Sequence, residues 1–439
     1  MARISRGPVA RALVVENPHP SLDERLAAQG IEVVRISGDA PDEAELIALI
    51  NRHGSQVLFK RSRVPVTRAV VASCPSLLAV QLCCIGDDSV DKQACADHGV
   101  LVFNDPVSNG RSVVELAIGH LIALSRRLYE TNDSCRRGAW EKNNLHRYEV
   151  RGKVLGVLGL GNIGRATARA AEALGMQIRF FDCREVAREV GRELGWQACA
   201  SMDELFATSD AVTVHVSAHD ADGSSNQALL GPELLLRLGA ERPEGSPRIF
   251  LNLSRGFLYP PEALIGAVEQ GAIRRAAVDV YPDEPRGKEP WTNPYADVPR
   301  IIVTPHLGAS TQEAQPRIAE RVAETFASFS RFGTLRDCVF APRARLGLLE
   351  DARAGGALLA VAHATTRGTK RAIDDAIYEA GASNLSSVHR DFGHLGMAYD
   401  LAHIDQPLSD AELEALVTAA GAVTGEPRAI RSVRQVVLG

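Results

Sequence analysis

Long apolar runs are missing from this sequence, and the absence narrows the classes of protein it can encode. No apolar stretch reaches the ~20 residues that a helix needs to cross a bilayer. The first eight residues lack the extended apolar core of a signal peptide. The net charge is −5, which disfavours a general nucleic-acid binder. We therefore expect neither a membrane nor a nucleic acid among the partners.

Paired cysteines are also missing. The sequence contains eight cysteines, but none forms a C-x-x-C pair or stands at metal-ligand spacing from a histidine. Most lie in apolar stretches, where a cysteine behaves as a small core residue. We therefore predict no metal site and no disulfide framework, and expect a reducing cytoplasm.

The chain is too long for one ordinary domain, since it has 439 residues. Short apolar strands alternate with helical stretches over residues 11–110, and again after an apolar helix at 112–128, which predicts two parallel-sheet α/β domains of Rossmann-like or flavodoxin-like type. A tail with the order β-α-β-β-α-β follows, typical of a ferredoxin-like α+β domain. A helix at 312–329 is expected to return to the first domain. The predicted domains are 1–110 with the return segment 309–343, then 111–308, then 344–439, with a linker at 341–352.

The most informative stretch is residues 152–182. An apolar strand, Val154 to Leu158, leads into Gly-Leu-Gly-Asn-Ile-Gly at 159–164, a helical stretch and a second strand that ends at Asp182. In this pattern the glycines allow a tight turn, a close approach of backbone to a pyrophosphate, and close packing of helix on strand. The helix N-terminus offers N–H groups to phosphates. We predict a dinucleotide site rather than a simple tight turn.

Asp182 stands where a carboxylate would accept hydrogen bonds from the ribose hydroxyls of a dinucleotide. The same carboxylate repels a 2′-phosphate, which favours NAD over NADP. Arg184, two residues away, leaves NADP open.

Three polar residues follow apolar strands in the second half: Arg255, Glu284 and His306. Ligands of open α/β sheets bind beyond the carboxyl ends of the strands, so all three are expected near one crevice. A histidine held by a carboxylate can take a hydroxyl proton, and an arginine can grip a substrate carboxylate. Taken singly, each has a structural explanation as a turn or loop residue. Beside a dinucleotide unit, the three together favour oxidation of a hydroxyl group by hydride transfer.

The sequence resembles the D-isomer-specific 2-hydroxyacid dehydrogenases over about residues 50–335. The resemblance is carried by the glycine motif, by Asn-Leu-Ser-Arg-Gly at 252–256, by Ala-Val-Asp-Val-Tyr-Pro-Asp-Glu-Pro at 277–285 and by Thr-Pro-His-Leu-Gly-Ala-Ser-Thr at 304–311. It implies that Arg255, Glu284 and His306 are the catalytic residues, with Glu284 the partner of His306. The cofactor contacts that it implies are Gly159, Gly161, Asn162, Ile163, Gly164, Asp182, His215, Val216, Ser254, Asp279 and Gly308.

Within the family, the resemblance is to the branch that oxidises 3-phosphoglycerate to 3-phosphohydroxypyruvate in serine biosynthesis. It rests on Lys-Arg-Ser-Arg at 60–63, on two further segments at 108–116 and 138–142, and on a tail that resembles an ACT domain. The first domain would then bind substrate. The substrate contacts that it implies are Arg61, Arg63, Gly86, Asp87, Lys142, Arg255 and His306. For the three cations outside the catalytic group, an ordinary basic surface is an equal alternative.

Two departures from the family pattern bear on substrate and regulation. Asp87 and Asp88 occupy a loop that is usually neutral, and they would oppose an anionic substrate unless turned away or neutralised. Asp88 is expected to be an N-cap, with Asp91 in the first turn of the helix. In the tail, His363, Thr365 and Asn384 mark the site of an amino-acid effector, but only the first matches the usual pattern. The module would bind an effector or only assemble subunits into a homodimer or homotetramer.

Two alternatives to this substrate assignment stay open. One is a dehydrogenase of the same mechanism that acts on another 2-hydroxy or 2-oxo acid. The other is a scaffold that senses NAD without turnover, against which the complete Arg, Glu and His set argues.

Overall fold

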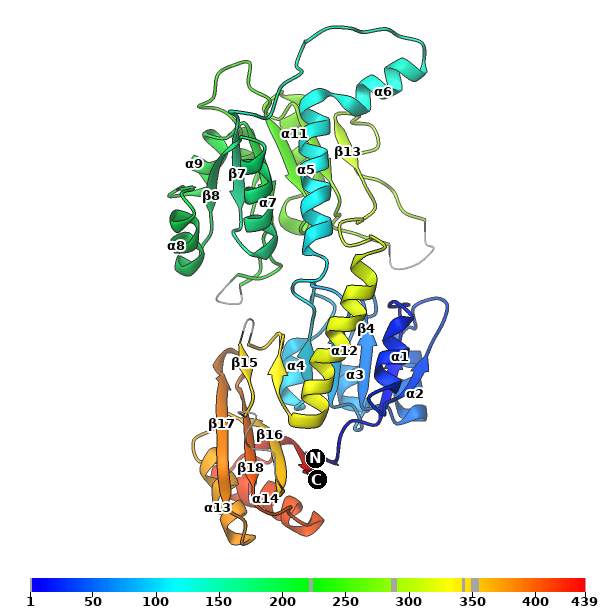
Figure 1. Cartoon of the computed structure of the whole chain (residues 1–439), viewed down its shortest axis with the longest axis vertical. Helices are drawn as coiled ribbons and strands as arrows, with labels where there is room; N and C mark the ends of the chain where they lie inside the picture. Colours follow the sequence, from blue (N-terminus) through cyan, green and yellow to red (C-terminus); the bar gives the residue numbers. More distant parts are fainter. Residues whose placement is uncertain (1, 221–223, 286–289, 342–343, 349–354, 439) are drawn as a thin grey trace. The chain divides into compact units, whose positions relative to one another are not determined.

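The computed structural model describes residues 2–438 apart from 221–223, 286–289, 342–343 and 349–354 (Figure 1). The chain divides into two compact units. Unit 1 contains Met1–Ser108 and Gln315–Gly439, and unit 2 contains Asn109–Ala314. Among the described residues, no helix has the length and apolar character needed to cross a bilayer.

The first sheet of unit 1 is parallel, with the strand order β3-β2-β4-β5-β6. Its central strands are apolar on both faces because helices cover both sides of such a sheet. The strands are β2 (Arg11–Val14), β3 (Glu32–Arg35), β4 (Val57–Lys60), β5 (Ala79–Leu82) and β6 (Leu101–Phe103). The helices are α1 (Ser21–Ala27), α2 (Glu43–His53), α3 (Arg68–Ser73) and α4 (Lys92–Asp97).

A long helix, α12 (Ala314–Phe332), returns the chain to this sheet. Its residues Ile318, Val322 and Phe326 are buried in the same apolar cluster as the strands, and the Phe326 ring packs edge-on against Phe59 with the centroids 5.2 Å apart. The first sheet of unit 1 and the long helix that packs on it therefore come from two separate stretches of the chain.

The sheet of unit 2 is also parallel, and its strand order is β13-β12-β11-β10-β7-β8-β9. The strands are β7 (Val154–Leu158), β8 (Gln177–Phe181), β9 (Gln197–Ala198), β10 (Ala211–Val214), β11 (Ile249–Asn252), β12 (Arg275–Val278) and β13 (Ile301–Val303). The helices are α5 (Gly110–Arg126), α6 (Leu128–Arg136), α7 (Asn162–Ala173), α8 (Glu185–Glu193), α9 (Met202–Ala207), α10 (Pro232–Leu236), η1 (Gly256–Leu258) and α11 (Pro261–Glu269). The order reverses between β7 and β10, where doubly wound sheets bind ligands.

The tail of the chain forms a second sheet in unit 1, with the order β1-β19-β16-β18-β17. The strands are β1 (Arg3–Arg6), β16 (Ala357–Ala364), β17 (Asn384–Phe392), β18 (Met397–Ile404) and β19 (Ile430–Val437). Helices α13 (Thr369–Glu379) and α14 (Asp410–Thr424) cover one face, and η2 (Gly393–Leu395) joins β17 to β18 (Figure 1). The β-α-β-β-α-β order predicted for residues 344–439 is present.

The other face of this tail sheet packs on the first sheet. Tyr399 and Leu401 belong to the same apolar cluster as Phe326, and the hydroxyl of Tyr399 donates to the carbonyl of Gly333 at 2.7 Å. The buried guanidinium of Arg434 lies 4.4 Å from the centre of the Phe329 ring. Tail and first sheet therefore share one core, although the predicted boundaries assign them to separate domains.

Two local expectations differ from the structure. Asp91, not Asp88, is the N-cap of α4, and its side chain accepts from the N–H of Ala94 at 2.8 Å. The expected linker contains β15 (Arg345–Leu346), which pairs antiparallel with β14 (Leu335–Arg336), while its residues 342–343 and 349–352 lie outside the described part of the chain.

Candidate functional site

The carboxyl edge of the unit 2 sheet gathers most of the predicted site residues. Gly159, Asp182 and His215 follow β7, β8 and β10 directly. Arg255, Asp279 and His306 follow β11, β12 and β13. Because all seven strands are parallel, these residues come to the same edge of one sheet.

The glycine turn has the geometry that a dinucleotide needs. Gly159 has a φ of +88°, and a Cβ there would lie 2.7 Å from the carbonyl oxygen of His215. A Cβ on Gly164 would lie 2.0 Å from the carbonyl oxygen of Gly159, so the helix packs on the turn too closely for any side chain. A Cβ on Gly161 would meet nothing within 4 Å. Gly161 is also the N-cap of α7, so this open space lies at the positive end of a helix, as a pyrophosphate requires.

Asp182 is buried and holds the turn in place. Its Oδ2 accepts from the N–H of Leu160 at 2.7 Å, and its two oxygens receive the guanidinium of Arg184 at 2.9 and 2.8 Å. Burial works to raise the pKa of Asp182, but the hydrogen bonds from Arg184 and Leu160 lower it below its ordinary value. The carboxylate therefore stays charged, and Arg184 partly neutralises it.

His215 and Val216 lie behind the glycine turn. The Nε2 of His215 lies 2.9 Å from the hydroxyl of Thr213, and burial lowers the pKa of His215 to about 4. The imidazole is thus neutral at physiological pH. Val216 packs close to Gly159, where an added Cβ would be 3.1 Å from its Cγ1.

A tight turn after β11 places Arg255. The side chain of Asn252 accepts from Ser254 and donates to the carbonyl of Arg255 at 2.9 Å. Gly256 follows at a point where a Cβ would come within 1.9 Å of the backbone of Tyr281. Only glycine fits there, which explains why Arg255 is followed by Gly256.

Asp279 positions the loop that carries His306. Its carboxylate accepts from the hydroxyl of Thr304 at 2.6 Å and from the N–H groups of Leu307 and Gly308, each at 2.8 Å. The backbone of His306 is left-handed, with a φ of +53°. A non-glycine residue adopts this conformation at a cost of about 1–3 kcal/mol, which the three bonds to Asp279 offset.

Glu284 orients the ring of His306. Its Oε2 accepts from Nδ1–H of His306 at 2.7 Å, which leaves Nε2 as the basic nitrogen. Burial works to lower the pKa of His306, but the hydrogen bond and charge of Glu284, with Asp279, raise it above its ordinary value, and Arg255 opposes them. The predicted set of Arg255, Glu284 and His306 therefore interacts electrostatically within unit 2.

The predicted phosphate contacts of unit 1 follow β4. Glu16 is buried, and its carboxylate accepts from the N–H groups of Arg61 at 2.7 Å, of Arg63 at 2.6 Å and of Val64 at 3.0 Å. Lys60, fully buried, donates to the hydroxyl of Ser89 at 2.6 Å. This loop is built around a carboxylate, so the backbone that presents Arg61 and Arg63 is well defined.

The acidic loop of unit 1 has a cation of its own. The ammonium of Lys92 lies 3.2 Å from Asp87, and both side chains are about one quarter exposed. Gly86 precedes this pair, and Asp88 is exposed. Lys142, in unit 2, is exposed. That these groups bind the same substrate as Arg255 and His306 stays a prediction.

The three tail residues predicted for an effector differ in their surroundings. His363 is buried against Asp400, whereas Asn384 lines a surface hollow together with Lys370. Thr365 is exposed and is not among the residues that line the hollow.

Sequence reasoning missed the residues that hold the site. Asn252, Asp279 in its loop-holding role, Glu16 and Lys92 act on backbone or on neighbouring charges rather than on a ligand. For Glu16 the sequence offers one signal, which is an acidic residue directly after the apolar run that ends at Val15.

Known proteins resemble this chain in sequence and in fold. Residues 118–308 match the family model described as "D-isomer specific 2-hydroxyacid dehydrogenase, NAD binding domain". The chain is similar to "D-3-phosphoglycerate dehydrogenase" of Escherichia coli, with 31% identity over 94% of this chain and 95% of the relative. It is also similar to the protein of that name in Dictyostelium discoideum, with 34% identity over 76% and 79% of the two chains.

Solved structures with the same fold include a protein from Thermus thermophilus, with 27% identity and a TM-score of 0.62 over 72% of this chain and 96% of the other. A glyoxylate reductase from Paecilomyes thermophila aligns with a TM-score of 0.65 and 24% identity over 76% and 98%. The predicted α/β fold with parallel sheets is confirmed. The chain belongs to the family of D-isomer-specific 2-hydroxyacid dehydrogenases, and it is an NAD-dependent oxidoreductase.

Proposed function

We propose that this chain is a D-3-phosphoglycerate dehydrogenase, which oxidises 3-phosphoglycerate to 3-phosphohydroxypyruvate. The observation that carries the proposal is the pair His306–Glu284, joined at 2.7 Å and held by Asp279 at the carboxyl edge of the dinucleotide-binding sheet. The relatives named D-3-phosphoglycerate dehydrogenase support the choice of substrate.

NAD, when bound, supplies the acceptor for the hydride that leaves C2 of the substrate. His306 takes the proton of the 2-hydroxyl at Nε2 as the C2–H and O–H bonds break and the C=O bond forms. Glu284 stabilises the resulting imidazolium through Nδ1–H. Arg255 holds the substrate carboxylate and so orients C2. The products are the 2-oxo acid, NADH and one proton, which His306 later releases to water.

The phosphate of the substrate would be bound by cations. Arg61 and Arg63, on the loop that Glu16 holds, and Lys142 are the proposed contacts. Steady-state kinetics of Arg61→Met and Arg63→Met test this assignment. We expect KM for 3-phosphoglycerate to rise at least tenfold while kcat changes little, because these groups bind the phosphate and not the reacting carbon. An unchanged KM in both variants overturns the phosphate assignment.

A dehydrogenase of another 2-hydroxy or 2-oxo acid is the second candidate, and Asp87 with Asp88 favours it. Lys92 neutralises Asp87, which weakens the objection to an anionic substrate. Rates across a panel of 2-hydroxy and 2-oxo acids decide between the two. A preference for 3-phosphoglycerate in kcat/KM supports the proposal, and the absence of one replaces it with the second candidate.

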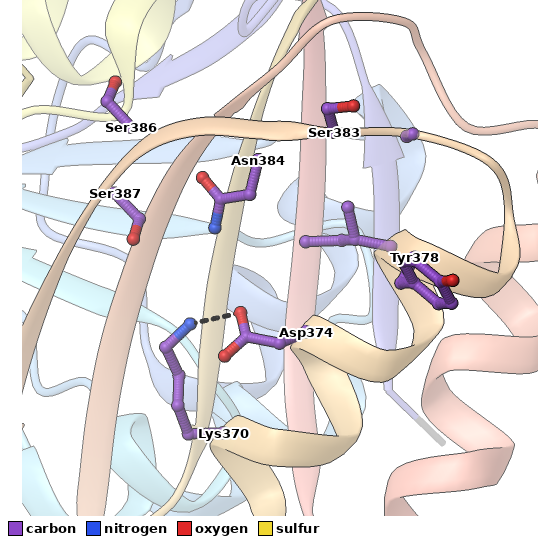
Figure 2. A pocket seen from close by; sticks show the side chains of 9 residues that line it. Lys370, Asp374, Tyr378, Ser383, Asn384, Ser386 and Ser387 are labelled. Atoms are coloured by element: carbon purple, nitrogen blue, oxygen red, sulfur yellow. Dashed lines mark hydrogen bonds and ion pairs between the residues drawn. The ribbon is translucent and has the colours of Figure 1, made fainter.

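We also propose that the tail is an ACT-like domain that binds an amino acid. Figure 2 shows Lys370 and Asp374 of α13 facing Asn384 and Ser387 of β17 across a surface hollow. Groups of both charges beside amide and hydroxyl groups suit a zwitterion. Inhibition by L-serine, compared between the wild type and Asn384→Leu, tests this site. We expect the variant to lose the response; inhibition that is equal in both contradicts the site.

Assembly into a homodimer or homotetramer, and a cytoplasmic location, are part of this proposal and follow from the resemblance and from cysteine usage. All eight cysteines are free thiols. Light scattering on the purified enzyme measures the subunit number.

A further inference from the structure

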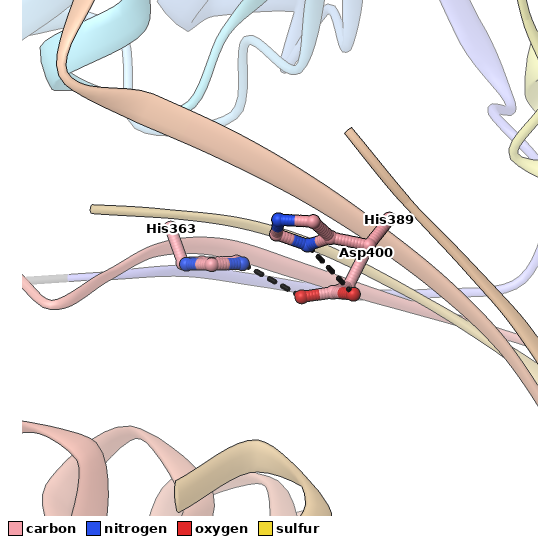
Figure 3. A group of neighbouring side chains, drawn as sticks. All are labelled: His363, His389 and Asp400. Carbon is pink, nitrogen blue, oxygen red and sulfur yellow. Dashed lines mark hydrogen bonds and ion pairs between the residues drawn. The ribbon is translucent and has the colours of Figure 1, made fainter. Parts of the chain in front are cut away.

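Two histidines and an aspartate meet on the helix-covered face of the tail sheet. His363 comes from β16, His389 from β17 and Asp400 from β18 (Figure 3). One ligand atom of each lies within 4.8 Å of the others. The three strands are neighbours in the sheet, so the cluster spans its edge strand and the two strands beside it.

The hydrogen bonds of His363 define which of its nitrogens is basic. Its Nδ1 lies 2.7 Å from the carbonyl oxygen of Ala364, which can only accept, so Nδ1 carries a proton. Its Nε2 lies 2.7 Å from Oδ2 of Asp400. An imidazole nitrogen without a proton and a carboxylate oxygen are both acceptors, so at this separation a second proton lies between them, and a metal ion takes its place only if the two atoms move slightly apart.

The surroundings of the cluster suit a metal ion. His363 and Asp400 are each 3% exposed, and the second carboxylate oxygen of Asp400 lies 3.2 Å from Nδ1 of the half-exposed His389. The bond from His363 to a backbone carbonyl is the one that orients histidine ligands in metal sites. Because His389 is half-exposed, its ring can turn to bring its nitrogen to bonding distance.

Two charged residues of α13, Lys370 and Asp374, lie beside the cluster. The ammonium of Lys370 lies 3.7 Å from Asp400 and 2.6 Å from Asp374. With neutral imidazoles, the two carboxylates and one ammonium leave one net negative charge, which favours a cation. Lys370 is the group that competes with that cation for Asp400.

We propose that His363, His389 and Asp400 bind a divalent transition-metal ion, with Zn²⁺ the best match. Two imidazole nitrogens and one carboxylate oxygen suit Zn²⁺, whereas Mg²⁺ and Ca²⁺ prefer oxygen ligands alone. Three protein ligands leave one position for water. The ion ties the edge strand β17 to β16 and β18, and no residue of the proposed reaction takes part.

Titration of the metal-free, full-length protein with ZnCl₂ tests the site. Calorimetry compares the wild type with His389→Ala, which alters an exposed ligand and leaves the buried core intact. We expect the variant to lose about 100-fold in affinity, or one bound equivalent. His394→Ala removes another exposed histidine of the same region and should bind as the wild type does.

Lys370→Met should change zinc affinity in the opposite direction. Because it removes the ammonium that competes for Asp400, zinc should bind about tenfold more tightly. Co²⁺ in place of Zn²⁺ should give the absorption of a nitrogen and oxygen ligand set, lost in His389→Ala, without the intense charge-transfer band of thiolate ligation. If the wild type, His389→Ala and Lys370→Met bind zinc alike, the cluster is an imidazolium–carboxylate pair and the proposal is rejected.

Discussion

Two histidine–carboxylate pairs in this chain have the same separation and opposite surroundings. His306–Glu284 and His363–Asp400 are each joined at 2.7 Å. In the first pair, the side chain of His306 is 48% exposed and that of Glu284 is 36% exposed. The carboxylate accepts a hydrogen bond from Nδ1–H, so Nε2 is left for a substrate. In the second pair, both side chains are 3% exposed. Both ring nitrogens of His363 have partners: Nδ1 contacts the carbonyl of Ala364, and Nε2 contacts the carboxylate of Asp400.

The comparison shows that separation alone does not identify an acid–base pair. A catalytic histidine needs one nitrogen directed outward and a backbone that presents it, which Asp279 provides for His306. A histidine with both nitrogens occupied inside a sheet serves structure or holds an ion.

Deletion of residues 345–439 should abolish soluble protein, because the tail sheet shares an apolar cluster with the first sheet and its removal exposes residues such as Phe326 and Phe329. Soluble yield and size-exclusion profiles of the truncated and full chains measure this effect. A soluble truncated chain with the kcat of the full chain would show that the second region is independent of the core.

Replacement of His306 by Gln should lower kcat about 10³-fold and leave the unfolding midpoint unchanged, because the side chain acts on the proton and lies on an exposed loop. Rates of NAD-dependent oxidation and urea unfolding are the measurements. His394→Gln is the matched control for a surface histidine. Turnover near that of the wild type would show that His306 is not the catalytic base.

Replacement of Glu284 by Gln should lower kcat/KM about 10²-fold and move its pH profile. Oxidation requires neutral His306, so the rate rises with pH through the pKa of His306, which Glu284 holds above its ordinary value. Without that charge the pKa falls, and the rising limb shifts to lower pH. A profile whose limb stays in place would show that another group titrates.

Two glycine variants separate binding from folding at the dinucleotide turn. Gly161→Ala should weaken NAD about tenfold with little loss of stability, because the added methyl group occupies space that no protein atom fills. Gly164→Ala should destabilise the fold, since its Cβ would lie 2.0 Å from a carbonyl oxygen. Fluorescence titration with NADH and thermal unfolding measure the two effects. Equal losses in both assays for both variants would contradict the assignment.

Asp182→Ala should weaken NAD more than NADP, by about fivefold in their ratio, because one hydrogen bond is worth about 1 kcal/mol. It also releases Arg184, which then faces a 2′-phosphate. Arg184→Ala should shift the ratio the other way. The ratio of kcat/KM values for the two cofactors is the measurement, and a ratio unchanged in both variants would remove these residues from cofactor choice.

Local patterns in the sequence predicted the parallel sheets, the glycine turn and the candidate residues Arg255, Glu284 and His306, because each depends on a short run of residues. Val154–Leu158 and Gln177–Phe181 were predicted at their observed bounds. The contacts of the tail were not predictable in this way. The four-residue strand β1 pairs with β19, which lies more than 400 residues later in the chain. His363, His389 and Asp400 come together only because their three strands pair. Contacts between distant residues leave no periodic signal in the chain.

The pairing of β1 with β19 also constrains the order in which the protein folds. Arg3–Arg6 lie in register with Ser432 to Gln435. The tail sheet of unit 1 therefore stays incomplete on the ribosome until residues 430–437 have been translated, whereas unit 2 lies within one continuous stretch and closes earlier. During synthesis, β1 therefore has no strand partner until β19 has been made.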